Sequence, residues 1–279
     1  MATKTSALSI LSGEAPATLS ELYAGVIENL QKQALSLKLK SQAYTGDPKT
    51  GSAVFKRFAN SESKEYGTAR TAGKGDKLNV LDVPVNLDQH KEIVEEIAKF
   101  DMETFSVTDI MRRRALNHPL SMATTLDRDF FQTAVDEGVT FTPADGVTET
   151  RDVIEAMIVT LEEVKNQYVD GVDRELMELT LSPTVHSALQ KYLDELGDKT
   201  ADSTKTVELF HNVRVYSSTR LPADTKAVLM ITGAVAQPVV THEYNEPEKI
   251  PLSNDFASSL FYDYGTKALT PDLIFVWKE

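Results

Sequence analysis

Two different periods organise the apolar positions in the first 45 residues. Thr18 and Glu21 form a capping box at the start of a helix. The apolar positions around and after it recur every three or four residues, as on one helix face: Leu19, Leu22, Tyr23, Val26, Leu30 and Ala34. From Leu35 to Lys40 apolar and polar residues alternate instead, which is the period of a strand. We therefore predict a helix and then a strand, which either packs on its own core or reaches out as an arm.

A strand, a long polar stretch and a second strand follow. Val54 to Phe58 is strand-like, residues 60–76 are almost wholly polar, and alternation resumes from Leu78 to Val85. A polar stretch of this length is uncommon inside a compact domain. Because its few apolar side chains cannot offset its ordering entropy, we expect a hairpin whose tip stays mobile or is ordered by lying on another surface.

The middle of the chain predicts one long helix. Residues 88–101 fit a helix or a strand, and both assignments stay open. Ser106 and Asp109 then cap an apolar-periodic segment that ends at Gly138. Pro119 lies inside it, so the pattern predicts a bent helix or two shorter ones.

Helices and strands alternate through the rest of the chain. One helix begins at Thr148 or Thr150 and is stopped by Gly171, and Ser182 with Pro183 caps and opens the next. Short runs typical of strands lie around these helices: Leu176–Leu181, Asn212–Ser217, Ala227–Ile231, Phe256–Tyr264 and Leu273–Trp277. The last two are predicted to be a closing pair of strands. The whole pattern indicates an α+β fold.

Charge separates the hairpin from the rest of the chain. The protein has 279 residues and a net charge of −13, which disfavours specific nucleic-acid binding because such binders present basic footprints. The charged residues between Gly46 and Val80 are Lys49, Lys56, Arg57, Lys64, Arg70, Lys74 and Lys77 against Asp47, Glu62, Glu65 and Asp76. Seven cations and four anions leave this segment at +3. The asymmetry favours docking on an acidic neighbour, and a solvated loop without a partner is the alternative.

The usual signatures of catalysis and metal binding do not occur. The five histidines show no HxxxH or HExxH spacing, and there is no cysteine. The segment from Gly67 to Gly75 differs from a phosphate loop, since one residue too many separates its glycines and Gly75 stands where Ser or Thr would bind magnesium. No apolar stretch approaches the ~20 residues that span a bilayer. We expect no catalysis, no cofactor, no metal and no membrane partner.

Taken in order, these elements resemble the major capsid proteins of tailed phages, which have the HK97-like fold. The resemblance rests on the polar hairpin, Leu181-Ser182-Pro183, the segment from Asn212 to Pro222 and the end from Phe256 to Glu279. It covers nearly the whole chain and concerns the order of elements. It implies an N-terminal arm, an extended β-hairpin called the E-loop, a long spine helix, a peripheral domain and an axial domain.

The resemblance also implies domain boundaries and contact residues. The expected parts are the arm (1–45), the E-loop (46–85), the peripheral domain with the spine helix (86–172), the axial domain (173–252) and C-terminal strands returning to the peripheral domain (253–279). The implied inter-subunit contacts of the E-loop are Phe55, Lys56, Arg57, Phe58, Lys64, Arg70, Lys74 and Lys77. Those of the arm are Leu19, Leu22, Tyr23 and Val26.

What the resemblance implies about function is a structural protein of the virion. Its main partner would be itself, in the hexamers and pentamers of an icosahedral shell assembled in the host cytoplasm. Because the chain leaves no room before the arm for a scaffolding segment, a separate scaffolding protein is expected, together with a portal and non-specific contact with packaged double-stranded DNA. An encapsulin-like compartment shell shares the fold, and a soluble hydrolase or binding module is the alternative from another class.

Overall fold

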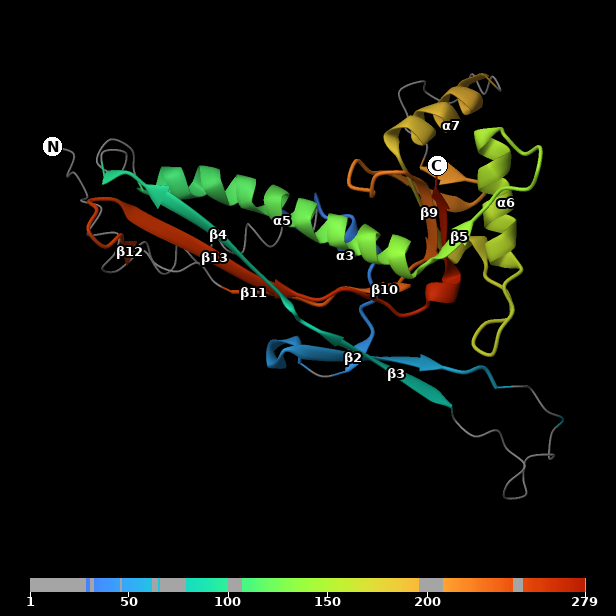
Figure 1. Ribbon diagram of the computed structural model, residues 1–279, viewed down its shortest axis with the longest axis horizontal. Helices are drawn as coiled ribbons and strands as arrows, with labels where there is room; N and C mark the ends of the chain where they lie inside the picture. The colour runs from blue at the N-terminus through green and yellow to red at the C-terminus, as the bar shows by residue number, and fades with distance from the viewer. Residues whose placement is uncertain are drawn as a thin grey trace.

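The computed structural model describes residues 29–30, 33–45, 47–61, 65, 79–99, 107–195, 208–242 and 248–278. A long helix and a ribbon of strands extend from a compact body, and a hairpin projects beside them (Figure 1). The helices are α3 (Ser36–Leu39), α5 (Val107–Glu137), α6 (Thr150–Glu162) and α7 (Pro183–Glu195), with short 3-10 turns η2 (Pro48–Thr50), η4 (Arg174–Leu176) and η5 (Pro271–Leu273). No helix in the described part of the chain is long and apolar enough to cross a membrane.

The strands of the described residues form four sheets. Those of the hairpin and the long ribbon are β1 (Tyr44–Thr45), β2 (Ser52–Phe58), β3 (Val80–Asn86), β4 (Gln89–Ile97), β11 (Val239–Thr241), β12 (Glu248–Lys249) and β13 (Phe256–Tyr264). Those of the body are β5 (Val139–Phe141), β6 (Met177–Leu181), β7 (Leu209–Phe210), β8 (Val213–Ser217), β9 (Thr225–Ile231) and β15 (Ile274–Lys278), and β10 (Val235–Ala236) pairs with β14 (Lys267–Ala268).

The spine segment is one helix of 31 residues, α5, and Pro119 does not divide it. An interior proline removes one backbone hydrogen bond and costs about 3 kcal/mol. One side of the turns that follow it is completely buried, because Met122, Ala123 and Leu126 pack with Leu260 of β13. This packing outweighs the local cost, so of the two predicted alternatives, a bent helix or two shorter ones, the second is wrong.

The strand β13 is the centre of the ribbon that runs beside α5 (Figure 1). It pairs with β4 over nine residues on one edge and with β11 and β12 on the other. Residues 88–101, for which two assignments were open, therefore form a strand from Gln89 to Ile97. Leu260, Tyr262 and Tyr264 are buried toward α5, so α5 covers one face of this sheet.

The compact body is built on a six-stranded sheet in the order β5-β15-β9-β6-β8-β7. Helices α6 and α7 pack on one face through Ile158 and Leu189, and the end of α5 packs on the other through Phe130 and Phe131. All five residues of β6 are buried, as expected for a strand covered on both faces. The predicted closing strands both exist, but they do not pair with each other, because β13 belongs to the ribbon and β15 lies between β5 and β9.

Two local predictions are wrong for identifiable reasons. The alternating segment from Leu35 to Lys40 forms the helical turn α3, because the Asp127 carboxylate accepts hydrogen bonds from the backbone nitrogens of Leu35 (3.2 Å) and Ser36 (2.8 Å) and so caps it. Helix α6 ends at Glu162 and not at Gly171. Beyond it, the side-chain oxygen of Asn166 accepts from the backbone nitrogens of the two residues at 168 and 169 (2.8 and 3.0 Å), a turn that competes with the helix.

Candidate interface of the hairpin and the open sheet face

The hairpin of β2 and β3 packs firmly on the body at its base. β2 and β3 pair continuously from Ser52 opposite Asn86 to Phe58 opposite Val80. One side of the hairpin is apolar, and its members are buried against Ala236: Ala53, Phe55, Val83 and Val85. The hairpin is therefore a rigid extension of the body up to residue 58.

Two of the predicted contact residues are used inside the chain. Phe55 is only 2% exposed, so it offers no surface to a neighbour. Arg57 forms two 2.7 Å hydrogen bonds to Asp272, and its guanidinium lies 4.0 Å from the ring centroid of Tyr168. Asn166 also donates to Asp272 (2.5 Å). Expected as docking residues, Phe55 and Arg57 instead hold the hairpin on its own subunit.

The contact of Arg57 with Asp272 anchors the hairpin to the body, and the sequence did not reveal Asp272 as the partner in this anchor. Partial burial acts to raise the pKa of its carboxyl, but the hydrogen bonds and charge of Arg57 outweigh that effect and hold the pKa below its usual value. The two residues are 215 positions apart, so no spacing rule joins them.

The opposite face of the hairpin carries exposed side chains. Lys56 is exposed, and Phe58 is 55% exposed beyond the end of the buried strip. These two residues can meet another molecule without disturbing the anchor. The remaining predicted contacts lie outside the described residues: Lys64, Arg70, Lys74 and Lys77 in the hairpin, and Leu19, Leu22, Tyr23 and Val26 in the arm.

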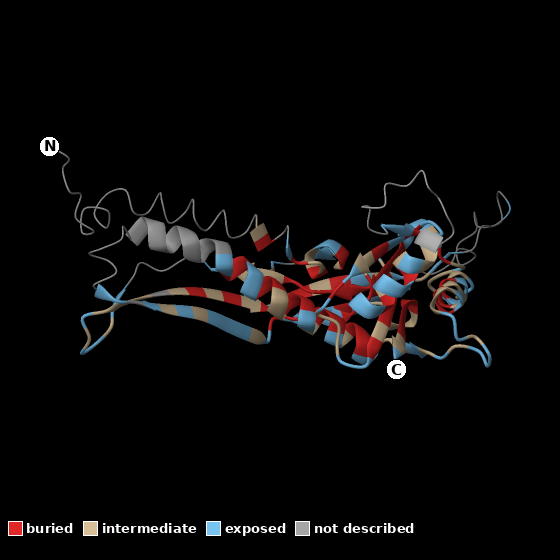
Figure 2. Cartoon of the chain, turned by 90° about the horizontal axis from the view of Figure 1, so that it is seen from above, coloured by how far each residue is buried: buried red, intermediate tan, exposed pale blue. Residues whose placement is uncertain are grey.

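The ribbon has a second open surface, on the side turned away from α5. Alternation along β4 and β13 places on it the residues that are out of phase with the buried ones, namely His90, Glu92, Val94, Glu96, Phe261 and Asp263. Val94 is 51% exposed. Figure 2 shows intermediate and exposed residues along these strands. We call this surface the open sheet face; it combines two apolar side chains with several carboxylates.

Two histidines share one carboxylate on the open sheet face. Asp263 contacts Nδ1 of His90 (2.7 Å) and Nε2 of His242 (2.9 Å), one on each oxygen. The hydrogen bond from His242, reinforced by the one from His90, holds the pKa of Asp263 below its usual value. This histidine clasp joins β4, β13 and the residue after β11, beside a pocket of about 370 Å³ that reaches Lys49 at the hairpin base.

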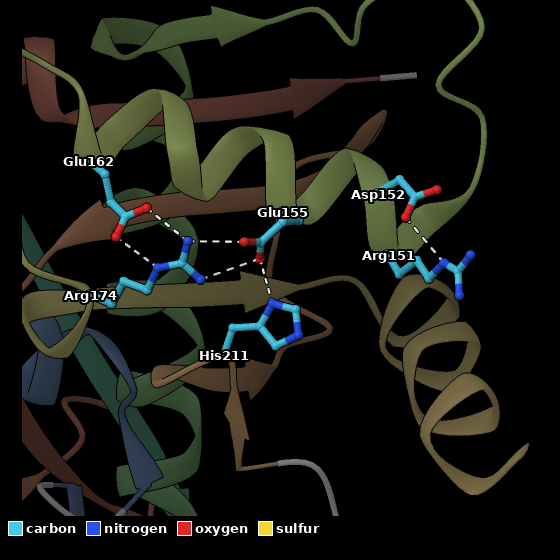
Figure 3. Close-up of polar contacts among 6 residues, drawn as sticks. All are labelled: Arg151, Asp152, Glu155, Glu162, Arg174 and His211. Atoms are coloured by element: carbon cyan, nitrogen blue, oxygen red, sulfur yellow. Dashed lines mark hydrogen bonds and ion pairs between the residues drawn. The ribbon is translucent and has the colours of Figure 1, made fainter. Parts of the chain in front are cut away.

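A second polar cluster lies in the body (Figure 3). Arg174 bridges Glu162 (2.7 Å) and Glu155 (2.9 Å) of α6, and Nδ1 of His211 contacts Glu155 (2.6 Å). The hydrogen bond from Arg174 lowers the pKa of Glu162. With each carboxylate already paired, the cluster fastens η4 and the turn before β8 to α6. Within the described ranges, no three His, Cys, Asp or Glu side chains are grouped so that they could hold a metal ion.

Comparison with known proteins finds solved structures whose fold is similar to that of this chain. No protein-family model and no curated protein matches the sequence. Among solved structures, one from Mycobacterium phage Che8 is 18% identical, with 81% of this chain and 84% of that chain covered at a TM-score of 0.59. The capsid of Cyanophage P-SCSP1u is 13% identical (88% and 88% covered, TM-score 0.63). A virus-like particle from Pyrococcus furiosus is 12% identical (93% and 98% covered, TM-score 0.58).

At these identities the likeness is one of fold. The chain has the α+β, HK97-like fold found in phage capsid proteins, and the match extends over most of its length. The fold expected from the order of elements is confirmed.

Proposed function

We propose that this chain is the major capsid protein of a tailed double-stranded DNA bacteriophage, a structural protein that assembles into the icosahedral shell of the virion and catalyses no reaction. The observation that carries the proposal is the match of nearly the whole chain, and not of one module, to phage capsid subunits. Assembly would take place in the host cytoplasm. Shells of this kind are built from many copies related by closed symmetry.

The contacts between copies follow from what the subunit leaves uncovered. The outer side of the hairpin, with Lys56 and Phe58, would lie on an acidic surface of a neighbour, and the other basic hairpin residues Lys64, Arg70, Lys74 and Lys77 would extend that contact. The arm would add Leu19, Leu22, Tyr23 and Val26. Because Phe55 and Arg57 are engaged inside the subunit, their part is to hold the hairpin in place.

We also propose a division into domains. The arm (1–45) and the E-loop (46–85) keep the expected bounds. The peripheral domain would consist of α5 and the ribbon of β4, β11, β12 and β13. The axial domain would be the six-stranded body, which takes in α6 and β15 in addition to most of residues 173–252, because both pack in its core.

Further partners complete the proposal. Copies would form hexamers and pentamers, a separate scaffolding protein would guide assembly, and a portal would occupy one vertex. Packaged DNA would be contacted only non-specifically, because the net charge of −13 opposes a broad phosphate-binding surface.

A closed protein compartment without a genome is the second candidate. It is favoured by the likeness to the virus-like particle from Pyrococcus furiosus, which covers 98% of that chain. Co-production with a portal and scaffolding protein separates the two candidates. A capsid protein is expected to incorporate a portal into its particles, whereas a compartment shell is expected to close alike with and without these partners.

The direct test is particle formation. The purified protein, alone and with a scaffolding partner, is expected to form capsomers or shells visible by light scattering and negative-stain microscopy. Lys56→Glu combined with Phe58→Asp is expected to reduce the yield of particles, and Lys191→Glu on the exposed side of α7 is the matched charge control. A monodisperse monomer under every assembly condition would contradict the proposal. Circular dichroism establishes that each variant is folded.

A further inference from the structure

The ammonium group of Lys40 is mostly buried and has few polar partners among the described residues. It follows α3, and its ammonium donates one hydrogen bond, to the backbone carbonyl of Gln237 (2.9 Å). That carbonyl is fixed in place, because the buried side chain of Gln237 donates to the carbonyl of Leu126 (2.8 Å). An ammonium has three donors, and in the part of the chain that the structure describes this carbonyl is its single acceptor.

The surroundings of this amine are unfavourable for a cation. Burial lowers the pKa of Lys40 to about 8. Buried charges in folded proteins are ordinarily paired with an opposite charge or a metal. Among the described residues, Lys40 has no carboxylate within ion-pair distance. Within the described ranges, this cation therefore lacks a counter-ion.

Lys40 opens into a pocket of about 480 Å³. Its described lining consists of three apolar side chains and four polar ones: Leu30, Leu37, Val239, Lys38, Lys40, Gln42 and Thr241. The residues of this described lining include two lysines and no acid. A carboxylate on an aliphatic stem matches this chemistry, because its oxygens can accept charge-assisted hydrogen bonds while its methylenes lie on the leucines.

We propose that this pocket, the Lys40 pocket, receives an acidic side chain of a second copy of the chain when subunits assemble. The inference rests on the proposed function, since it needs copies that meet. A second copy suits the pocket because the chain has 42 acidic against 29 basic residues, so its surface is rich in carboxylates. A DNA phosphate suits it less well, because DNA-binding surfaces line up many cations along the backbone, whereas this pocket has two and is partly apolar.

The inference makes a chemical prediction for one amine. In the free subunit Lys40 is expected to react with a trace of acetic anhydride with the pH dependence of an amine that titrates near 8. In the assembled particle a carboxylate would return it to the ordinary lysine value of about 10.4, so its neutral fraction at pH 8 would fall on the order of 100-fold. Lys191, exposed on α7, is the internal reference in the same mass-spectrometric measurement.

Two substitutions complete the test. Lys40→Met keeps an apolar stem and removes the charge, so the free subunit is expected to remain folded with an unchanged or raised Tm. Its particle yield is expected to fall at least about 10-fold, whereas Lys40→Arg keeps the charge and a substantial yield. Lys191→Met controls for loss of a lysine elsewhere.

The outcomes are separable. If wild-type protein forms no particles, the proposed function is wrong. If wild-type particles form, the inference is overturned when Lys40 reacts equally in subunit and particle, or when Lys40→Met assembles like wild type. Protection of Lys40 that arises only after DNA is added also overturns it, in favour of a phosphate. If Lys40→Met does not fold, the labelling of the wild-type protein still decides.

Discussion

The two large sheets of this protein are covered to different degrees. In the six-stranded body, β6 is buried along its whole length. Helices α6 and α7 cover one face of this sheet, and α5 packs on the other face against β9 and β15. In the ribbon, α5 covers one face of β13 and β4, and Val94 lies exposed on the other. The sheet of the body is thus covered on both faces within one chain. Among the described residues, the sheet of the ribbon is covered only on the face that packs against α5.

The composition of each sheet fits its degree of coverage. The body buries nearly continuous apolar strands, which favours folding of the isolated subunit. The open sheet face mixes Val94 and Phe261 with Glu92 and Glu96, so it stays soluble while alone and can still be covered by a partner. A surface of this kind suits a protein that folds first and assembles afterwards.

The largest effect is expected at Asp127 of α5, the helix that packs on both sheets. The buried carboxylate of Asp127 accepts from Ser36 and from Arg220 (2.5 Å), linking α5 to α3 and to the segment after β8. Asp127→Ala leaves Arg220 without its counter-ion and uncaps α3, so we expect a loss of about 3–5 kcal/mol in the free energy of unfolding. Urea denaturation measures it. An effect below 1 kcal/mol would show that the link is dispensable.

Two alanine substitutions, one in each sheet, test most directly how far each sheet is covered in the free subunit. Leu179→Ala in β6 removes a completely buried side chain and is expected to cost about 2–5 kcal/mol. Val94→Ala on the open sheet face is expected to change subunit stability by less than about 0.5 kcal/mol, while it lowers the stability of particles. Similar losses for both variants in the free subunit would refute the view that one face is uncovered.

A smaller effect is expected at the joint between the hairpin and the ribbon. A Cβ added at Gly265 would lie 1.8 Å from the carbonyl oxygen of Asn86, so the backbone must shift. Gly265→Ala is expected to cost about 1–3 kcal/mol. Hydrogen exchange should report the loss mainly in β3 and β13. Gly146→Ala, at a turn with open space but a φ of +88°, controls for strain without a clash. Equal losses in the two variants would exclude a role for close approach.

The smallest effect is expected from pH at the histidine clasp. Because the pKa of Asp263 is depressed in the folded state, its contribution to stability is present above the ordinary Asp value of about 3.9 and is lost as pH falls through the folded value. The clasp is partly exposed, so the contribution is at most about 1 kcal/mol. Asp263→Asn should flatten the stability profile below pH 4, and Asp82→Asn on the exposed hairpin side should not. If the Asp263→Asn variant kept the pH profile of the wild-type protein, the histidine clasp would make no contribution to stability.

The sequence by itself determined the elements whose signal is local and repeated. The apolar period of α5, the Ser182-Pro183 start of α7 and the alternating strands on both sides of the polar stretch follow from side-chain spacing and capping chemistry. The order of these elements resembles that of tailed-phage major capsid proteins, and the fold that this resemblance implies is the one observed.

Only the tertiary structure decided which elements meet. The segment after Leu35 alternates like a strand, yet Asp127, some 91 residues away, caps it as a helix. In the sequence Arg57 resembles a free hairpin cation, whereas in the structure it pairs with Asp272. Strands β13 and β15 are close in sequence but belong to different sheets. The spacing of apolar residues along the chain indicates whether a segment suits a helix or a strand. The free energy of a capping hydrogen bond, an ion pair or a strand pairing depends in addition on a partner residue, and the spacing does not specify that partner.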